Sequence, residues 1–492
     1  MKSFFKINTV IGLIVFGQSQ AVKAQSLIFE RVFDKTLAQT SYIIGNSLTR
    51  EAIVIDPKRD IDTYLEIAQD KGLNITHVTE THIHADYLSG SRELAAATGA
   101  KLYLSDMGGK DWQYEFAHLP LKEGDKIELG SLALEVMHTP GHTPESLTFL
   151  LKDQSAPLTP IKAITGDFIF VGDVGRPDLL EKAAGQVGTQ EASAKQLFAS
   201  ISRFMKLPDN TEIWPGHGAG SFCGKSLSSE PQSTLKQEKS SNHALQFLNN
   251  EAGFIDYILS DQPVPPKYFA MMKNLNKVHR PLLVEVPKHA KLSKIEADRA
   301  INNKLQIIDT RSKEIVASGF IPGSLHIEGG NSFSTFLGSL LDYDQQFILV
   351  AEEDKIEDLT RKLMRIGLDN IYGYISNVNG QSLALLKSDR VDLDKFETKI
   401  DSKDVQMVDV RTATEFKNGH IKGAENISFT SLTENMDKIS RDKPVIIHCQ
   451  SGARANIAYS ILKKNGFNNI LNYSGGINDW VEKGKELEKK IH

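Results

Sequence analysis

A short run of metal-binding side chains constrains this chain more than any other segment. His82, His84 and Asp86 stand two residues apart, at the end of an apolar stretch from Ile75 to Thr81 that predicts a β-strand. Imidazoles at this spacing can project from the turn after a strand, where neutral imidazole suits Zn²⁺ or Fe²⁺. The run ends in Tyr87, and a phenol with an ordinary pKa of about 10 is a poor ligand at neutral pH. We therefore expect a one-metal site, which argues against two-metal hydrolysis.

Three later segments also place a candidate ligand just past an apolar strand. His142 follows the strand predicted over residues 132–137, Asp167 follows the next apolar stretch, and His217 follows the strand predicted over residues 211–213. A single histidine is more often an ordinary core residue. Side chains that leave separate strands can nevertheless converge on one ion, so four such segments in this order predict a metal site.

In these motifs the chain resembles the metallo-β-lactamase superfamily from about residue 26 to residue 286, and within it the persulfide dioxygenases. The resemblance implies an αββα sandwich in which His82, His142 and Asp167 bind one Fe²⁺ per chain. Two imidazoles and one carboxylate leave open positions on iron, one for a substrate sulfur and one or two for O₂. The expected reaction is oxidation of a small-molecule persulfide to sulfite.

The resemblance also implies residues around the ion. His84 is expected beside the metal as an outer or alternative ligand, and Asp86 and His217 are expected to orient the ligands by hydrogen bonds. Zinc takes the place of iron in the alternative, a glyoxalase II-like thioester hydrolase in which a metal-bound hydroxide attacks a carbonyl. Tyr87 argues against that alternative, because it removes one donor from a second metal.

Two further residues are expected close to the substrate. Arg176, in a stretch that looks like the family's aspartate segment, is expected to pair with a substrate carboxylate; a salt bridge to Asp173 or Asp178 is the alternative. Cys223 lies six residues past His217 in a loop rich in glycine and serine. It is expected either to touch persulfide sulfur or to be a buried, inert thiol.

The remainder of the chain repeats itself. Ile308-Asp309-Thr310-Arg311 recurs one hundred residues later as Val408-Asp409-Val410-Arg411. A period near one hundred residues is too long for a solenoid and fits tandem domains. Two copies of one small α/β domain are therefore expected, over residues 293–390 and 392–492.

The second copy carries a cysteine at a telling position. Residues 445–448 form an apolar strand, and the loop from Cys449 to Arg454 leads into a helix expected over residues 455–464. Backbone N–H groups and the positive end of the helix dipole would stabilise a thiolate or a persulfide on Cys449. This six-residue loop resembles the active loop of rhodanese sulfurtransferases. The resemblance implies that Cys449 and Arg454 are catalytic and that Arg411 contacts the substrate.

The first copy differs at the decisive position. Residues 347–350 align with the strand before Cys449, but the next residue is Ala351, followed by Glu352 and Glu353. No nucleophile remains there, and two carboxylates would repel an anionic sulfur. The first copy is therefore predicted to be inactive and to serve as a scaffold or a docking surface.

The N-terminus predicts export. Lys2 and Lys6 precede a short apolar core over residues 10–17, and Val22-Lys23-Ala24 supplies a small-residue cleavage pattern. A periplasmic or exported enzyme is expected, and a cytoplasmic enzyme with an uncleaved extension is the alternative. A net charge of -5 without a long basic run excludes a nucleic-acid footprint, and no segment reaches the length of a membrane span.

The expected chain is thus an α/β protein with a signal peptide over residues 1–24, a metallo-β-lactamase-fold domain over 25–286, and an inactive and an active rhodanese domain. Sulfane sulfur on Cys449 could convert sulfite to thiosulfate, or thiosulfate could enter there in reverse. A sulfur carrier without turnover is the second alternative. We further expect a homo-oligomer, and a surface loop over the polar residues 226–241.

Overall fold

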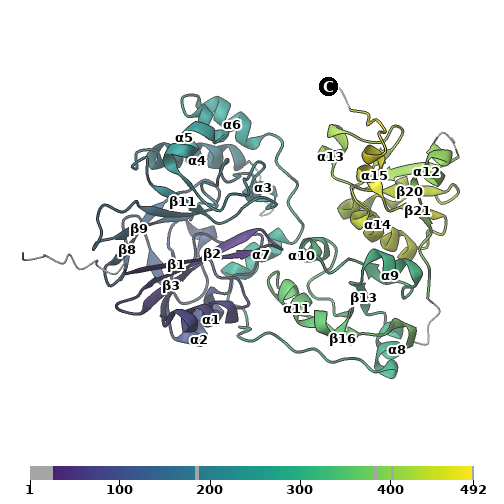
Figure 1. Ribbon diagram of the computed structural model, residues 1–492, viewed down its shortest axis with the longest axis horizontal. Helices are drawn as coiled ribbons and strands as arrows, with labels where there is room; N and C mark the ends of the chain where they lie inside the picture. The colour runs from purple at the N-terminus through teal and green to yellow at the C-terminus, as the bar shows by residue number, and fades with distance from the viewer. Residues whose placement is uncertain (1–25, 183–187, 381–384, 401–403, 490–492) are drawn as a thin grey trace, which may run out of the picture.

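The computed structural model describes residues 26–182, 188–380, 385–400 and 404–489, so the signal peptide expected over residues 1–24 lies outside the described residues. Three α/β units follow one another along the chain (Figure 1). Here the first unit means residues 26–277, the second unit residues 291–386 and the third unit residues 390–489. Within the described ranges, no helix combines the length and the apolar character that a membrane crossing requires.

The first unit is a sandwich of two six-stranded sheets, each in sequence order. The first sheet contains β1 (Leu27–Asp34), β2 (Gln39–Asn46), β3 (Glu51–Ile55), β4 (Asn74–Thr79), β5 (Lys101–Ser105) and β6 (Leu119–Leu121). The second sheet contains β7 (Lys126–Leu129), β8 (Leu132–His138), β9 (Leu147–Asp153), β10 (Lys162–Gly166), β11 (Glu212–Pro215) and β12 (Ser233–Thr234).

Helices cover the outer face of each sheet (Figure 1). The first sheet is covered by α1 (Asp62–Lys71) and α2 (Ser91–Thr98), and the second by α4 (Gln190–Phe204), α5 (Leu235–Ser241) and α6 (Glu251–Leu259). Two more helices, α3 (Leu179–Lys182) and α7 (Phe269–Lys277), lie on the side of the first unit that faces the second and third units (Figure 1). The layers are therefore those of the expected αββα sandwich.

Alternating side chains explain the layers. Tyr42 and Ile44 of β2 pack between the two sheets against residues of β8 and β9, whereas Ile43 packs on the helical side with Tyr64 of α1. Successive residues of a strand point to opposite faces, so a strand that is apolar on both faces must be covered twice. All eight residues of β2 are buried.

The second and third units share one strand order. The second unit has the parallel order β14-β13-β15-β16, and the third has β19-β18-β20-β21 with β17 added beyond β21. The strands of the second unit are β13 (Gln306–Asp309), β14 (Leu325–His326), β15 (Phe347–Val350) and β16 (Ile371–Ile375). Those of the third are β17 (Arg390–Val391), β18 (Gln406–Asp409), β19 (Glu425–Asn426), β20 (Val445–His448) and β21 (Ile470–Tyr473).

The helices repeat as well. The second unit carries α8 (Lys294–Asn302), α9 (Lys313–Ser318), α10 (Phe333–Gly338) and α11 (Ile356–Met364); the third carries α12 (Leu393–Ile400), α13 (Ala413–Asn418), α14 (Ala453–Lys464) and α15 (Gly476–Glu482). This common plan agrees with the hundred-residue repeat in the sequence. The sheet of the third unit begins at β17, so its first strand starts two residues before the expected boundary at 392.

The surface loop expected over residues 226–241 is only partly a loop. Its second half forms β12 and α5, and the Thr234 hydroxyl caps the helix by accepting a hydrogen bond from the Gln237 N–H at 3.3 Å. Leu235, the first residue of this helix, is fully buried. A cap of this kind needs a single threonine and one apolar anchor, which the polar composition of the segment concealed.

Buried ion pairs join the first unit to the second. Arg365, at the end of α11, bonds Asp60 through its Nε at 2.8 Å and through its Nη2 at 2.5 Å, and its Nη1 lies 3.0 Å from Asp34 Oδ2. In this contact between the first and second units, here called the seam, the Leu88 N–H donates to the Arg365 carbonyl at 2.7 Å. The seam is therefore part of the folded core rather than a loose contact.

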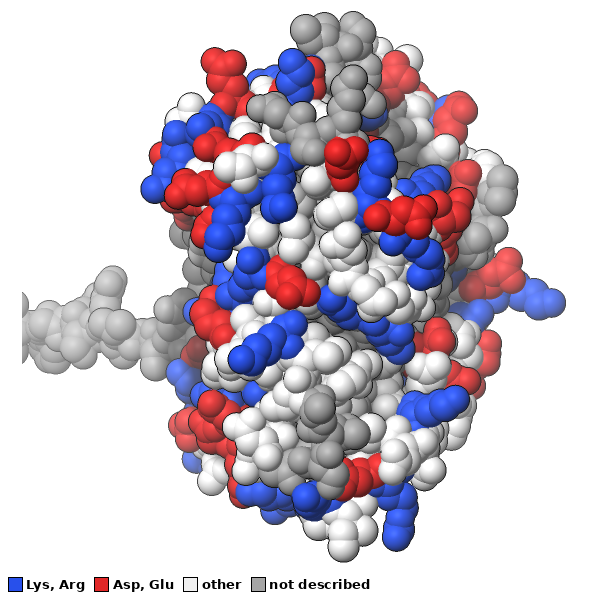
Figure 2. All heavy atoms as spheres, turned by 90° about the vertical axis from the view of Figure 1, so that its right-hand side faces the viewer, with Lys and Arg blue, Asp and Glu red and all other residues white. Residues whose placement is uncertain are grey.

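The third unit packs on the second through α14. The Ser460 hydroxyl of this helix accepts the backbone N–H of His326 in β14 at 3.1 Å. On the outer face of these two units, acidic and basic side chains are interspersed and neither sign forms a continuous field (Figure 2).

Candidate functional site

Loops at one end of the sandwich bring the predicted metal ligands together. His82 follows β4 of the first sheet, while His142, Asp167 and His217 follow β8, β10 and β11 of the second. All four side chains are almost completely buried. The site therefore lies between the two sheets, and each sheet contributes to it.

His82, His142 and Asp167 face one another. Asp167 Oδ2 lies 3.5 Å from His142 Nε2 and 3.9 Å from His82 Nε2, and the two imidazole rings have centroids 5.0 Å apart. His82 Nε2 and Asp167 Oδ2 have no hydrogen-bond partner although both atoms are buried. Unpaired buried polar atoms are costly, so three donors that converge in this way fit a cation.

Hydrogen bonds behind the rings fix which nitrogen faces the site. The Thr81 hydroxyl donates to Asp56 Oδ2 at 2.8 Å, so its lone pair accepts the Nδ1–H of His82 at 3.0 Å. His142 likewise donates its Nδ1–H to the Arg176 carbonyl at 2.9 Å. Both rings therefore turn a bare Nε2 lone pair toward Asp167, as metal-ligating histidines do.

The titration behaviour of these groups suits a metal. Burial, together with neighbouring imidazoles, lowers the pKa of His82 well below its usual range, and burial also lowers the pKa of His142. Burial alone would raise the pKa of Asp167, but His217 and the two other histidines hold it far below its usual range. Two neutral imidazoles and one carboxylate are the donors that divalent iron and zinc accept.

His217 joins two carboxylates. Its Nδ1 lies 2.6 Å from Asp167 Oδ1, and its Nε2 lies 2.7 Å from Asp86 Oδ2. Burial would lower the pKa of His217, but the two carboxylates raise it well above its usual range, so the ring donates from both nitrogens. His217 and Asp86 thus hold Asp167 in place by hydrogen bonds.

His84 is not one of the three converging donors, and one of its ring nitrogens bonds a carboxylate while its Nδ1 has no hydrogen-bond partner. Its Nε2 lies 3.0 Å from Asp56 Oδ1, and its ring packs between those of His82 and Tyr87, with centroids 4.2 and 4.5 Å away. The Tyr87 hydroxyl donates to the Asp56 carbonyl at 3.0 Å, and burial raises the pKa of the phenol well above its usual range. Tyr87 is therefore a packing residue rather than a ligand.

Asp56 is the residue that sequence reasoning missed. It follows β3 directly, with a φ of 55°, and it accepts the Thr81 N–H at 2.6 Å in addition to its contacts with His84 and the Thr81 hydroxyl. An aspartate just past an apolar strand was the available signal, as it was for Asp167. Nothing in the local sequence tells that Asp56 supports the histidine run.

Arg176 takes the alternative that the sequence left open. Its guanidinium is fully buried and forms a fork with Asp178, in which Nε and Nη2 each donate at 2.7 Å. Its Nη1 donates to the carbonyls of Phe222 and Pro263 at 3.0 and 2.6 Å. These bonds occupy the guanidinium N–H groups that a substrate carboxylate would need. The expected contact with substrate is therefore corrected: Arg176 has a structural role.

Cys223 lies beside the metal cluster. Its sulfur and the nearest ligand atoms of Asp86 and His217 all lie within 4.8 Å of one another. Burial raises the pKa of the thiol well above its usual range, and Asp167 and Asp86 raise it further. Cys223 is thus a protonated thiol in this environment, although it is close enough to meet a sulfur compound at the ligands.

Cys449 occupies the position expected for a sulfur nucleophile. It follows β20 directly, it is buried, and its Sγ accepts the Gly452 N–H at 3.1 Å just before α14 begins. Gly452 has a φ of 96°, and an added Cβ would lie 2.3 Å from the Ser474 carbonyl oxygen. Only glycine permits this turn, which aims the backbone amides at the sulfur.

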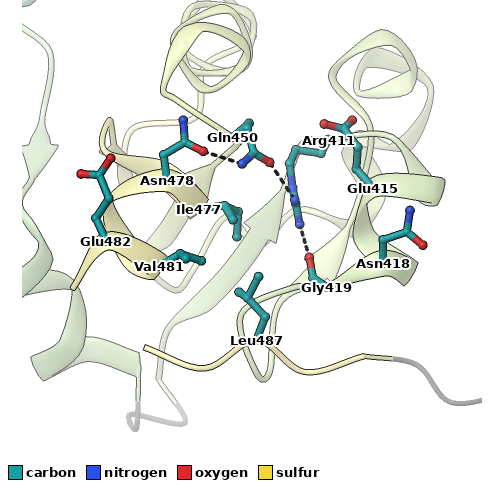
Figure 3. A pocket seen from close by; sticks show the side chains of 10 residues that line it. All are labelled: Arg411, Glu415, Asn418, Gly419, Gln450, Ile477, Asn478, Val481, Glu482 and Leu487. Carbon is teal, nitrogen blue, oxygen red and sulfur yellow. Dashed lines mark hydrogen bonds between the residues drawn. The ribbon is translucent and has the colours of Figure 1, made fainter. Parts of the chain in front are cut away.

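Two arginines frame the loop differently. Arg454 forms a fork with Glu415 at 2.6 and 2.7 Å; burial alone would raise the pKa of Glu415, but Arg454 lowers it to about 2. Arg411 instead lines a neighbouring cavity of about 460 Å³, where it bonds Gln450 at 3.1 Å and the Gly419 carbonyl at 2.7 Å (Figure 3). Arg454 borders the cavity that contains Cys449, and Arg411 does not.

The equivalent position in the second unit holds no nucleophile. Ala351 follows β15 and lines a cavity of about 450 Å³ together with Glu352. Glu353 does not face this cavity, because its carboxylate pairs with Lys291 at 2.9 Å. Of the two carboxylates expected beside Ala351, only Glu352 therefore borders this cavity, which Glu328 and Asp358 also line.

Two family profiles match the chain. The profile of the metallo-beta-lactamase superfamily matches residues 35–217, and that of the rhodanese-like domain matches residues 392–483. A crystal structure of a metallo-beta-lactamase from Staphylococcus aureus subsp. aureus COL is 42% identical, with a TM-score of 0.67, and this chain covers 100% of it through 72% of its own length. The chain belongs to the metallo-beta-lactamase superfamily. The match to that crystal structure covers 72% of this chain and therefore extends beyond residues 35–217, which the superfamily profile matches.

Curated relatives of this superfamily member include persulfide dioxygenases. The mitochondrial persulfide dioxygenase ETHE1 of Mus musculus is 29% identical over 229 residues, which are 46% of this chain and 79% of that protein. Its counterpart from Homo sapiens is 29% identical over 220 residues, 43% of this chain and 78% of that protein. A metallo-beta-lactamase domain with such homologues, followed by a rhodanese domain, fits a dioxygenase–rhodanese fusion.

Proposed function

We propose that this protein oxidises a low-molecular-weight thiol persulfide to sulfite in its first unit and transfers sulfane sulfur at Cys449 in its third. The observation that carries the first part is the convergence of His82 Nε2, His142 Nε2 and Asp167 Oδ2 in a buried site. Likeness to persulfide dioxygenases and to a rhodanese domain supports both parts.

The donor set favours one Fe²⁺. When bound, iron would supply open coordination positions for a sulfur ligand and O₂, and the redox chemistry that joins them. The protein's part is to hold His82 and His142 as neutral donors and to orient Asp167 through His217. Burial of the site excludes bulk water from a reactive sulfur substrate.

The sulfur-transfer step needs no oxidant. The Cys449 thiolate attacks the outer sulfur of a persulfide, the new bond joins Cys449 Sγ to that sulfur, and the carrier leaves as its thiolate. Sulfite can then attack the same outer sulfur, which yields thiosulfate and regenerates the Cys449 thiolate. The reverse order uses the same residues. The amide of Gly452 stabilises the anionic sulfur in either direction.

We assign the second unit as a rhodanese-like domain without a nucleophile. Its strand order repeats that of the third unit, and Ala351 stands where Cys449 stands there. The export signal expected at residues 1–24 remains a further proposal, which the N-terminal sequence of the mature protein tests.

Oxygen-electrode assays test the proposed oxidation. Iron-loaded protein supplied with glutathione persulfide is expected to consume O₂ and to release sulfite or thiosulfate. Protein that holds two zinc ions and hydrolyses thioesters without O₂ uptake would establish the glyoxalase II-like alternative instead. Stoichiometric sulfur labelling of Cys449 without turnover would establish a carrier.

A further inference from the structure

Cys449 opens into a cavity that all three units share, here called the interunit cavity. Its volume is about 850 Å³. The first unit contributes Phe222 and the segment Val264–Lys267, and the second contributes Ser332 and Phe336 from the start of α10. The third unit contributes Phe429 and the loop of Cys449. The nucleophile therefore faces a space that its own unit encloses only in part.

The interunit cavity is much larger than a small inorganic donor requires. At roughly 30 Å³ per water molecule, its volume holds several times the non-hydrogen atoms of thiosulfate or sulfite. It falls within the range of roughly 300–1,000 Å³ that is typical of small-molecule pockets and too small for a folded partner. The size thus fits a thiol carrier that brings a sulfur to Cys449.

Its surface suits such a carrier. The rings of Phe336 and Phe429 meet edge to face with centroids 5.2 Å apart, so the second and third units form one aromatic wall. Lys267 borders the cavity and pairs with Glu434 at 2.6 Å, which links the first unit to the third. Aromatic and aliphatic walls with a few polar groups are the usual lining of a small-molecule site.

The second unit also braces the loop of Cys449. The Lys313 ammonium, at the start of α9, donates to the Ser451 carbonyl at 3.0 Å. An added Cβ on Gly452 would lie 3.3 Å from the same nitrogen. The unit that lacks a nucleophile thus contacts the nucleophile's loop as well as enclosing the space before it.

We propose that the interunit cavity binds the carrier part of a small-thiol persulfide that delivers sulfur to Cys449, and that Phe336 and its neighbours in the second unit determine which carrier fits. This inference rests on the proposed sulfur transfer at Cys449. The carrier's sulfur–sulfur bond breaks as the bond to Cys449 forms, and the carrier thiolate leaves through the same cavity.

The test compares a large and a small donor in the full-length protein. Ser332 is exposed, lines the cavity and makes no side-chain cap to α10, so Ser332→Trp fills the space without removing a structural bond. With glutathione persulfide as donor, kcat/KM is expected to fall at least tenfold, mainly through KM. With thiosulfate as donor and cyanide as acceptor, kcat/KM is expected to stay within twofold.

Two further variants complete the test. Gln345→Trp places the same indole on an exposed position of the second unit outside the cavity lining, and it is expected to change neither reaction. Phe336→Ala widens the cavity and is expected to raise KM severalfold for glutathione persulfide only. Equal losses with both donors in Ser332→Trp, or no loss with either, would overturn the inference. Wild-type protein that transfers sulfur from neither donor would instead refute the proposed function of Cys449.

Discussion

His448 offers a pH test of the environment beneath the Cys449 loop. It is the last residue of β20 and is fully buried. Burial, with a smaller contribution from Arg411, lowers its pKa from 6.5 to about 4 despite the nearby Asp409. As the pH falls, His448 takes up a proton at about pH 6.5 in the unfolded chain but only at about pH 4 in the folded chain. The stability that neutral His448 contributes is therefore complete above pH 6.5 and is lost as the pH falls from 6.5 to 4.

The size of this effect follows from the two pKa values. Between pH 7.5 and pH 5, the proton-linked loss amounts to about 2 kcal/mol of unfolding free energy. His448→Val copies the second unit, where Val350 occupies the equivalent position in β15, and it removes the titrating ring at similar volume. Relative to the wild type, the variant is expected to gain about 2 kcal/mol on going from pH 7.5 to pH 5.

Urea unfolding followed by circular dichroism measures the difference. Wild type and His448→Val are each unfolded at pH 7.5 and pH 5, and the change in their difference cancels all other titrating groups. The transition that contains the third unit is the one to compare, because a chain of several units need not unfold in one step. A stability gap that is the same at both pH values would refute a neutral, buried His448.

Three shorter predictions concern the two sites and the seam. His142→Ala removes one of three donors, so metal content and O₂ uptake should collapse while sulfur transfer persists; unchanged metal content would contradict the ligand set. Cys449→Ser should abolish sulfur transfer but leave O₂ uptake with release of sulfite. Adding Ala351→Cys to this variant should not restore sulfur transfer. If Cys449→Ser also abolished O₂ uptake, the metal would take its substrate from Cys449. Arg365→Met removes the guanidinium that Asp60 and Asp34 share, while Lys58 stays 3.1 Å from Asp60, and it should lower the unfolding free energy by about 3 kcal/mol. Asp60→Asn added to it should recover part of this loss in the same urea titration, and an additive loss would argue against a shared ion pair.

Much of the fold was predictable because its strands are continuous apolar runs. The expected strands over residues 347–350 and 445–448 coincide with β15 and β20. Strands that are buried on both faces leave such runs in the sequence. The helix α5 was missed because a cap and one anchor define it within a polar segment.

The ligands were predictable for a different reason than their surroundings. His82, His142 and Asp167 each follow a strand, and the carbonyl ends of strands meet at one end of a sandwich. Their supports come from distant parts of the chain: Asp56 lies 28 residues from His84, and Lys313 lies 138 residues from Ser451. A local sequence pattern contains no information about such distant pairs. The sequence also did not decide whether Arg176 pairs with Asp178 or with a substrate.

The hydrogen bond from the Leu88 N–H to the Arg365 carbonyl bears on where the chain can be cut into separately expressed fragments. Leu88 directly follows Tyr87, so the turn that carries the histidine run is anchored to the second unit. A fragment that stops at residue 286 would leave this amide bare and would turn Asp60 and Asp34 toward water without a guanidinium. A fragment that keeps these bonds to the first unit therefore extends through the second unit, although the superfamily profile ends at residue 217.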